Sequence, residues 1–144
     1  MLGEISRADQ EQLNELNLME YLESTTPVPF PQAPNVLGRV DLLLDLMGPN
    51  HHLQISGKLY DYFACQRPIL SVSPNRELDE IFAVTRTGHR VPLEPAAIIE
   101  VLQERYQEKR AGISFQPNLT AIQRFSAQFA TRQLSQILDE VSSP

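Results

Sequence analysis

Short apolar runs alternate along this chain with segments in which apolar residues recur every three or four positions. The runs of strand length are RVDLLLDL at 39–46, RPILSVS at 67–73 and GHRVPL at 88–93. The segments with helical spacing that follow them span 56–66, 74–85 and 95–110. A continuous apolar run is typical of a strand that is covered on both faces. The alternation of strands and helices therefore predicts an α/β structure, with helices flanking a parallel sheet.

The N-terminal part of the chain lacks this alternation. Ser6 followed by Asp9 is the pattern of a capping box, and we expect a helix from there to about Leu18. The segment TTPVPFPQAPN at 25–35 then holds four prolines. Because proline cannot donate a hydrogen bond to a sheet, we expect an irregular connector that contributes at most an edge strand.

Prolines also mark the expected helix starts farther along the chain. Ser73 before Pro74 predicts an N-cap and the first position of the second helix. Pro95 opens the third helix in the same way. The segment at about 118–141 is expected to form one or two helices. These should pack on the domain and not lie on a membrane, because their polar side carries glutamines and one arginine in place of a basic stripe.

Length and composition limit the classes of function. A chain of 144 residues, 42% of them hydrophobic, fits a single globular domain. Its formal net charge of −6 argues against broad nucleic-acid binding, which usually requires a basic surface. A local cationic spot can still bind a compact anion, because a few donors aimed at one point suffice.

Cysteine usage and hydropathy favour a cytoplasmic protein. Cys65 is the only cysteine, so no intrachain disulfide can form, and its apolar neighbours favour a buried structural thiol over a nucleophile. No apolar run approaches the length needed to cross a bilayer, since the run at 40–47 is interrupted by Asp45. The residues at 1–12 lack the pattern of a signal peptide.

The candidate chemistry lies where strands end and helices begin. In parallel sheets, ligands gather at the carboxyl ends of the strands, and the segments 46–58 and 73–77 should share that edge. Ser56 is a candidate N-cap, and Gly57 allows a ligand to approach the backbone closely. The free amides of the first turn, the helix dipole and the ammonium of Lys58 together favour a phosphate or diphosphate.

A purely structural role for the same residues stays open. Many helices begin Ser-Gly-Lys without binding a ligand, and Lys58 and Asp61 would then form a solvated pair of little energetic weight. The motif is not a P-loop, because no glycine stands five positions before Gly57 and Leu59 follows the lysine in place of a hydroxyl residue. The histidine pair at 51–52 lacks a third ligand at helical spacing, so no metal site is expected.

The order of these pieces resembles the carboxyl-terminal, nucleotide-sugar-binding domain of GT-B glycosyltransferases, and most of all the retaining group 1 (GT4-like) family. In that family, a strand with an aspartate near its start is followed by a loop and by a helix that reads approximately KLYEYLAAGRP. Here the strand is GRVDLLLDL, and the helix reads KLYDYFACQRP at 58–68. The likeness covers most of the chain, although only this central block is specific.

The resemblance implies a Rossmann-like layered sheet that binds a nucleoside-diphosphate sugar without a metal cofactor. It implies that Lys58 stabilises the diphosphate leaving group, that Asp61 holds the ribose, and that the loop at 48–54 borders the donor sugar. The candidate substrate-binding residues are Ser56, Gly57, Lys58, Leu59, Asp61, Ser73, Pro74 and Asn75.

The sequence departs from the family pattern in several places. Leu53 stands where many relatives carry a second acidic residue, Asp61 shortens the ribose-binding acid, and Gln66 replaces the usual glycine. The family also has an upstream strand and helix with a basic pair that grips the phosphates, and an acceptor-binding domain. We therefore expect an N-terminally incomplete part of a two-domain glycosyltransferase, inactive by itself.

Two other functions stay open. The first is a non-catalytic α/β structural or interaction module, in which the exposed sheet edge contacts an acceptor domain or a second copy of the chain. The second is a different enzyme of the same architecture, such as a nucleotide-sugar epimerase, which would require an acid- and histidine-lined cleft across two domains.

Overall fold

In the computed structural model, which describes residues 5–142, the chain falls into two compact units, Met1–Val36 and Leu37–Pro144. Residues 1–4, which begin the segment that lacks a signal-peptide pattern, lie outside the described part. The second unit has an α/β fold compatible with a Rossmann-like layout. Its sheet is parallel in the order β1-β2-β3, and the strands are β1 (Leu43–Leu46), β2 (Ile69–Val72) and β3 (Gly88–Val91). The predicted parallel sheet flanked by helices is confirmed.

The first unit begins with α1 (Arg7–Glu15), which the side chain of Ser6 caps as expected. The Ser6 hydroxyl accepts a hydrogen bond from the Asp9 amide at 3.1 Å and donates one to the Asp9 carboxylate at 2.6 Å. The helix ends before the expected Leu18, because Asn17 adopts a left-handed backbone with φ of 55°.

The proline-rich segment is more helical than the sequence predicts. After a short 3-10 helix η1 (Met19–Tyr21), it contains a second, η2 (Phe30–Gln32), and the five-residue α2 (Ala33–Leu37). The expectation of an irregular connector at 25–35 is therefore wrong for 30–35. The physical reason is positional: Pro34 lies in the first turn of α2, where its missing amide hydrogen costs no intrahelical hydrogen bond.

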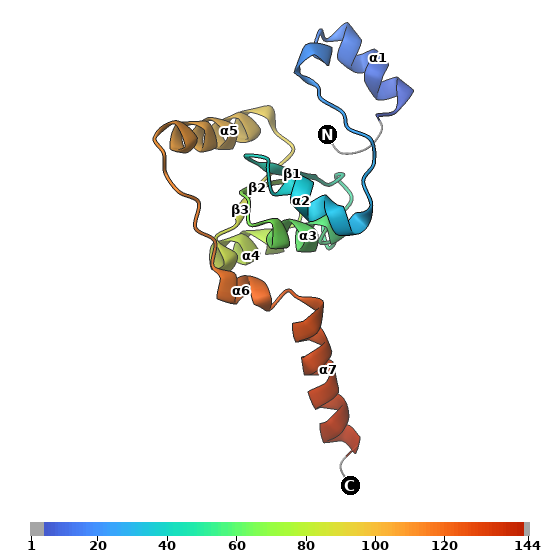
Figure 1. The fold of residues 1–144 in the computed structure, drawn as a ribbon, viewed down its shortest axis with the longest axis vertical. Helices are drawn as coiled ribbons and strands as arrows, with labels where there is room; N and C mark the ends of the chain where they lie inside the picture. Colours follow the sequence, from blue (N-terminus) through green and yellow to red (C-terminus); the bar gives the residue numbers. More distant parts are fainter. Residues whose placement is uncertain (1–4, 143–144) are drawn as a thin grey trace. The chain divides into compact units, whose positions relative to one another are not determined.

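Helices cover both faces of the sheet in the second unit (Figure 1). α3 (Gly57–Cys65) and α4 (Glu77–Thr85) lie on one face, and α5 (Pro95–Arg110) lies on the other. The buried residues under α3 and α4 are Leu43, Leu59, Phe63, Ile69, Leu78 and Phe82. Those under α5 are Leu70, Val72, Val91 and Val101. Two apolar layers thus hold the central strand β2, which is buried along its whole length.

Strand β1 is covered on one face only. Leu43 and Asp45 are buried, whereas Leu44 and Leu46 are 49% and 64% exposed. The expectation of a strand buried on both faces is therefore wrong here. The reason is that the core under α5 is built from β2, β3 and α5. From the neighbourhood of β1, only Leu42, just before the strand, packs against this core.

The start of α4 also differs from the sequence prediction. The helix begins at Glu77 and not at Pro74. Asn75 closes a turn ahead of it, because the Asn75 Oδ1 accepts a hydrogen bond of 3.0 Å from the Glu77 amide. A side-chain acceptor two residues before an amide is the geometry of an Asx turn, and it delays the helix.

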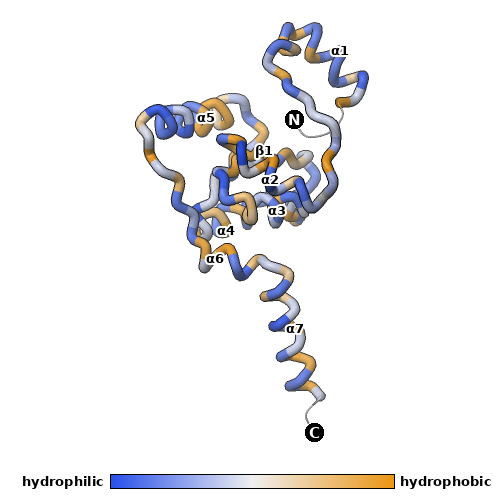
Figure 2. The backbone as a smooth tube through the Cα atoms, viewed as in Figure 1, coloured by the Kyte–Doolittle hydropathy of each residue, from blue (hydrophilic) through white to orange (hydrophobic). Residues whose placement is uncertain are grey.

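The C-terminal segment forms two helices, α6 (Leu119–Gln123) and α7 (Ala127–Ser142), as predicted. Between them, Phe125 packs on Phe63 with ring centroids 5.3 Å apart. α7 packs less than expected: its apolar residues alternate with polar ones (Figure 2), and most of its large apolar side chains, apart from the half-buried Phe129, are exposed. They are Leu134, Ile137, Leu138 and Val141. Within residues 5–142, no helix combines the length and the apolar character needed to cross a membrane.

Candidate functional site

The carboxyl ends of the strands bring the two predicted segments together. Leu46 pairs with Val72, and Val72 pairs with Val91, so the loops that follow the strands leave the sheet at one edge. The loop after β1 and the turn after β2 also touch directly, because the side-chain amide of Asn75 donates a hydrogen bond of 3.2 Å to the Gln54 carbonyl oxygen. The expectation that 46–58 and 73–77 share one edge is confirmed.

Helix α3 starts with unoccupied backbone donors. Ser56 is the N-cap residue, as predicted, but its buried hydroxyl makes no capping hydrogen bond. Its carbonyl oxygen accepts from the Leu59 amide at 3.1 Å. Among residues 5–142, the amides of Gly57 and Lys58 have no hydrogen-bond acceptor. Apart from its chain neighbours and the backbone of its own helix, no atom lies within 4 Å of the position that a Cβ on Gly57 would take, so a ligand can approach this turn.

Helix α4 starts at the same edge, but the positive end of its dipole is already met by side chains of the protein. The Glu77 amide bonds to Asn75, and Glu77, Asp79 and Glu80 place three carboxylates in the first turn. The first turn of α3 contains no acidic residue and carries Lys58 instead. Because acidic side chains and caps satisfy the positive end of a helix, the start of α3 is the better place for an external anion.

Lys58 and Asp61 do not pair with each other in the described part of the chain. Lys58 is exposed and Asp61 is half-buried. The solvated pair expected for a purely structural role is thus not formed. Leu59, another candidate, is buried in the core, and its amide donates to the Ser56 carbonyl oxygen. It therefore anchors α3 to the core and is not exposed to a ligand.

The candidates at 73–75 lie beneath this edge. Ser73 and Asn75 are each 1% exposed, and Pro74 is half-buried. The Ser73 hydroxyl accepts a hydrogen bond of 3.2 Å from the Asn75 amide, and its carbonyl oxygen accepts from Arg90 at 3.2 Å. Their polar groups are therefore engaged within the protein, and they shape the edge through their hydrogen bonds.

A buried carboxylate near this edge was not singled out as a site residue from the sequence. Asp45 is 1% exposed and accepts a hydrogen bond of 2.9 Å from the Ser71 hydroxyl on the neighbouring strand. Burial first, and then the charge of Asp45, raise the pKa of Tyr62 in α3. The available signal was an aspartate inside an apolar strand, which indicates a buried polar partner.

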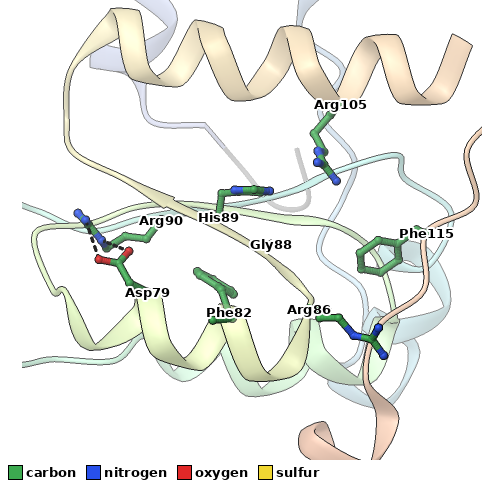
Figure 3. A pocket seen from close by; sticks show the side chains of 9 residues that line it. Asp79, Phe82, Arg86, Gly88, His89, Arg90, Arg105 and Phe115 are labelled. Carbon is green, nitrogen blue, oxygen red and sulfur yellow. Dashed lines mark hydrogen bonds and ion pairs between the residues drawn. The ribbon is translucent and has the colours of Figure 1, made fainter. Parts of the chain in front are cut away.

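A separate cavity of about 420 Å³ lies along the free edge of β3 (Figure 3). Its lining residues come from α4, β3, α5 and the segment after α5. They are Asp79, Phe82, Ala83, Arg86, Gly88, His89, Arg90, Arg105 and Phe115. Sequence patterns did not predict this cavity, because its lining residues are scattered over four segments without a common motif.

Two of the three arginines that line this cavity are paired, whereas Arg86 has no ion pair within residues 5–142. The Arg90 guanidinium binds the Asp79 carboxylate through contacts of 2.7 and 3.0 Å. Arg105 contacts Glu108 at 2.8 Å and Glu104 at 3.2 Å. Its Nε finds no hydrogen-bond partner in the described part of the chain, but this atom is buried and so out of reach of a ligand in the cavity. Because the carboxylate of Asp79 also lines the cavity and Arg86 is the one arginine there without an ion pair in the described chain, we rank the cavity as a weaker anion site than the start of α3.

The thiol and the histidines offer little chemistry. Burial first, and then the charge of Asp61, raise the pKa of Cys65, which disfavours the nucleophilic thiolate. The histidines at 51–52 are exposed. Within residues 5–142, no group of three or more His, Cys, Asp or Glu side chains is placed to hold a metal ion.

Comparison of the chain with protein-family models, with curated proteins and with solved structures finds no match in any of the three. Function is therefore inferred from the geometry at the start of α3 and from the sequence likeness at 58–68.

Proposed function

We propose that the start of α3 binds the diphosphate of a nucleoside-diphosphate sugar, as the donor-binding part of a glycosyltransferase. The observation that carries this proposal is the uncapped first turn of α3, with Lys58 beside it, at the carboxyl end of a parallel strand. The likeness of KLYDYFACQRP to the group 1 glycosyltransferases supports a nucleotide sugar over other anions.

The proposed chemistry needs donors aimed at one leaving group. During sugar transfer, the bond between the anomeric carbon and the diphosphate oxygen breaks while the oxygen of the acceptor hydroxyl forms a bond to that carbon. The proton of this hydroxyl passes to the departing diphosphate, which leaves with the bonding electron pair. Negative charge then grows on the diphosphate. The amides of Gly57 and Lys58, the positive end of the α3 dipole and the Lys58 ammonium would stabilise that charge. No metal is required in this scheme.

Asp61 would orient the nucleoside. It lies three residues after Lys58, on a neighbouring part of the helix surface, and its half-buried carboxylate has no ion-pair partner in the described chain. A carboxylate accepts two hydrogen bonds readily, which suits the two hydroxyls of a ribose. The diphosphate and the ribose would thus lie along one side of α3.

The test is a titration of the ¹⁵N-labelled chain with UDP, GDP and ADP, followed by amide chemical shifts. We expect saturable shifts centred on 56–61 and, for Lys58→Ala, an affinity about 10-fold lower, since one charge-assisted hydrogen bond is lost. The matched control is Lys109→Ala, which removes an exposed lysine paired with Asp41 at 2.6 Å. A folded spectrum that no nucleotide changes would contradict the proposal.

A non-catalytic interaction module is the second candidate. The observation that favours it is the pair of exposed leucines, Leu44 and Leu46, beside the free edge of β1. Exposed apolar side chains at a sheet edge suit a protein partner, either an acceptor domain or a second copy of the chain. This function predicts no nucleotide binding. It also predicts a self-association or partner contact that Leu44→Asn weakens, measurable by light scattering or by titration with the partner domain.

A further inference from the structure

We propose that Asn75 is a positioning residue that ties the loop at 47–56 to the end of β2 and the start of α4, and so fixes the entry of the chain into α3. The tie to the loop does not depend on the proposed function. Its consequence for a ligand, that the start of α3 is kept fit for binding, rests on the proposed function.

Asn75 connects three segments through one buried residue. It is 1% exposed, and its amide donates to the Ser73 hydroxyl at 3.2 Å. Its Oδ1 accepts from the amide of Glu77, the first residue of α4, at 3.0 Å. Its Nδ2 donates to the Gln54 carbonyl oxygen at 3.2 Å, which lies 21 residues away in the sequence. An amide side chain supplies an acceptor on one side and a donor on the other, which an ionised carboxylate of the same size cannot do.

The loop has few other polar attachments. Met47, at its start, donates to the Val72 carbonyl oxygen at 2.9 Å. Among the described residues, the other hydrogen bonds of 48–54 stay inside the loop, between His51 and Gly48 and between Gln54 and His51. Leu53, before Gln54, is 90% exposed and gives no packing, whereas Ile55, after it, packs against the core under α3 and α4. The bond from Asn75 is therefore, within residues 5–142, the one polar tie that holds the far end of the loop.

The position of this tie matters for the start of α3. Gln54 stands two residues before Ser56, and the backbone between them determines where the free amides of Gly57 and Lys58 point. Donors that are held in place before a ligand arrives bind it more tightly, because no ordering cost is added at binding. We therefore expect the tie to affect nucleotide affinity without any contact between Asn75 and the nucleotide.

Asn75→Asp separates the two side-chain roles. The carboxylate keeps an acceptor for the Glu77 amide but loses the donor to Gln54. The matched control is Asn118→Asp, since the Asn118 Oδ1 likewise accepts from a helix amide, that of Ala121 at 3.2 Å, and its Nδ2 donates to the Val84 carbonyl oxygen at 3.1 Å. This control makes the same chemical change at a helix start away from the loop.

The first readout is amide hydrogen exchange, which needs no ligand. We expect exchange at 50–55 to become about 10-fold faster in Asn75→Asp, the loss expected from one buried hydrogen bond, and to stay unchanged in Asn118→Asp. At acidic pH the introduced carboxyl is protonated and can donate to Gln54 again. Relative to the wild type at the same pH, protection of the loop should then return, which a general loss of stability would not produce.

The second readout is the UDP titration, in which we expect the affinity of Asn75→Asp to fall about 10-fold, as for loss of one preorganising hydrogen bond. Unchanged exchange at 50–55 in a folded variant would overturn the positioning role. Faster exchange with unchanged UDP affinity would overturn its consequence for the ligand. Faster exchange in a chain whose wild type binds no nucleotide would support the tie and overturn the proposed function alone.

A buried carboxylate can also prevent folding, so a second variant is needed. Asn75→Ser offers a neutral hydroxyl that can accept from the Glu77 amide but is too short to reach Gln54. It should show the same faster exchange at 50–55 as Asn75→Asp and no rescue at acidic pH. Wild-type protection of 50–55 in this variant would overturn the proposal.

Discussion

The hydroxyl of Tyr62 in α3 donates a hydrogen bond of 3.2 Å to the carbonyl oxygen of Leu44 in β1. The backbone groups of successive residues in a strand point to opposite sides. Leu43 and Met47 face β2, because their amides donate to the carbonyl oxygens of Pro68 and Val72. The carbonyl of Leu44 therefore points away from β2. The tyrosine thus satisfies a backbone acceptor at the free edge of the sheet and attaches α3 to that edge. The helix that carries the candidate site is therefore anchored by a polar contact as well as by its apolar face.

We predict that Tyr62→Phe lowers the free energy of unfolding by about 1 kcal/mol, the usual net worth of one hydrogen bond. Urea unfolding followed by circular dichroism measures this change. The control is Tyr60→Phe, which removes a hydroxyl from a more exposed tyrosine of the same helix. Equal stability of the wild type and Tyr62→Phe would contradict the contribution assigned to this contact.

Alkaline pH should destabilise the chain through α3. Burial raises the pKa of Tyr62, and the charge of Asp45 raises it further. Burial likewise raises the pKa of Cys65, and the charge of Asp61 adds to this. In the unfolded chain the thiol loses its proton from about pH 8.5 and the phenol from about pH 10. The folded chain retains both protons longer, so the unfolded state binds fewer protons and stability falls as the pH rises through this window.

This pH dependence is measured as the free energy of unfolding between pH 7 and pH 10.5. Cys65→Ala should flatten the fall at the lower end of the window, and Tyr62→Phe should flatten it at the upper end. The effect must be absent below pH 7, where both groups are protonated in both states. A wild-type slope that neither variant changes would show that other groups cause the fall.

Sequence patterns were sufficient for α3 because several signals agree there. The apolar spacing that ends in the buried Leu59 and Phe63, the N-cap at Ser56 and the preceding loop all indicate the same helix, and its bounds are close to those predicted. The strands β2 and β3 were found for a similar reason, since short apolar runs that begin at Pro68 and Gly88 are too short for helices and fit strands.

The errors arose where a distant or side-chain contact decides the structure. Pro74 was a suitable first helical residue, but Asn75 captures the Glu77 amide and moves the helix start, which no periodicity reveals. For β1, the apolar run could not show that α5 leaves one face uncovered at Leu44 and Leu46. Likewise, the likeness at 58–68 indicated an anion site at the start of α3. The sequence could not show that the start of α4 is the poorer site, because that depends on the hydrogen bond between Asn75 and the Glu77 amide.

Gly88 should be far less replaceable than Gly57. A Cβ added at Gly88 would overlap the backbone carbonyl of Ile69 in the neighbouring strand, where no side chain can move aside. We predict that Gly88→Ala lowers the free energy of unfolding by about 2 to 4 kcal/mol or prevents folding. Gly57→Ala should stay within about 0.5 kcal/mol of the wild type, because that position is open. Similar losses for both, measured by thermal and urea unfolding, would contradict the close approach of β2 and β3.

The exposed apolar side of α7 gives a final prediction about the isolated chain. Leu138 is 56% exposed, whereas Leu78 is fully buried between α4 and the sheet. Leu78→Ala should therefore cost about 2 to 5 kcal/mol through lost burial and a cavity, while Leu138→Gln should change the free energy of unfolding by less than about 0.5 kcal/mol. Urea unfolding at two protein concentrations measures both. A loss above about 1 kcal/mol for Leu138→Gln would mean that α7 packs on a surface of the protein, because a solvated side chain has no burial to lose. Dependence of that loss on protein concentration would identify the surface as a second copy of the chain.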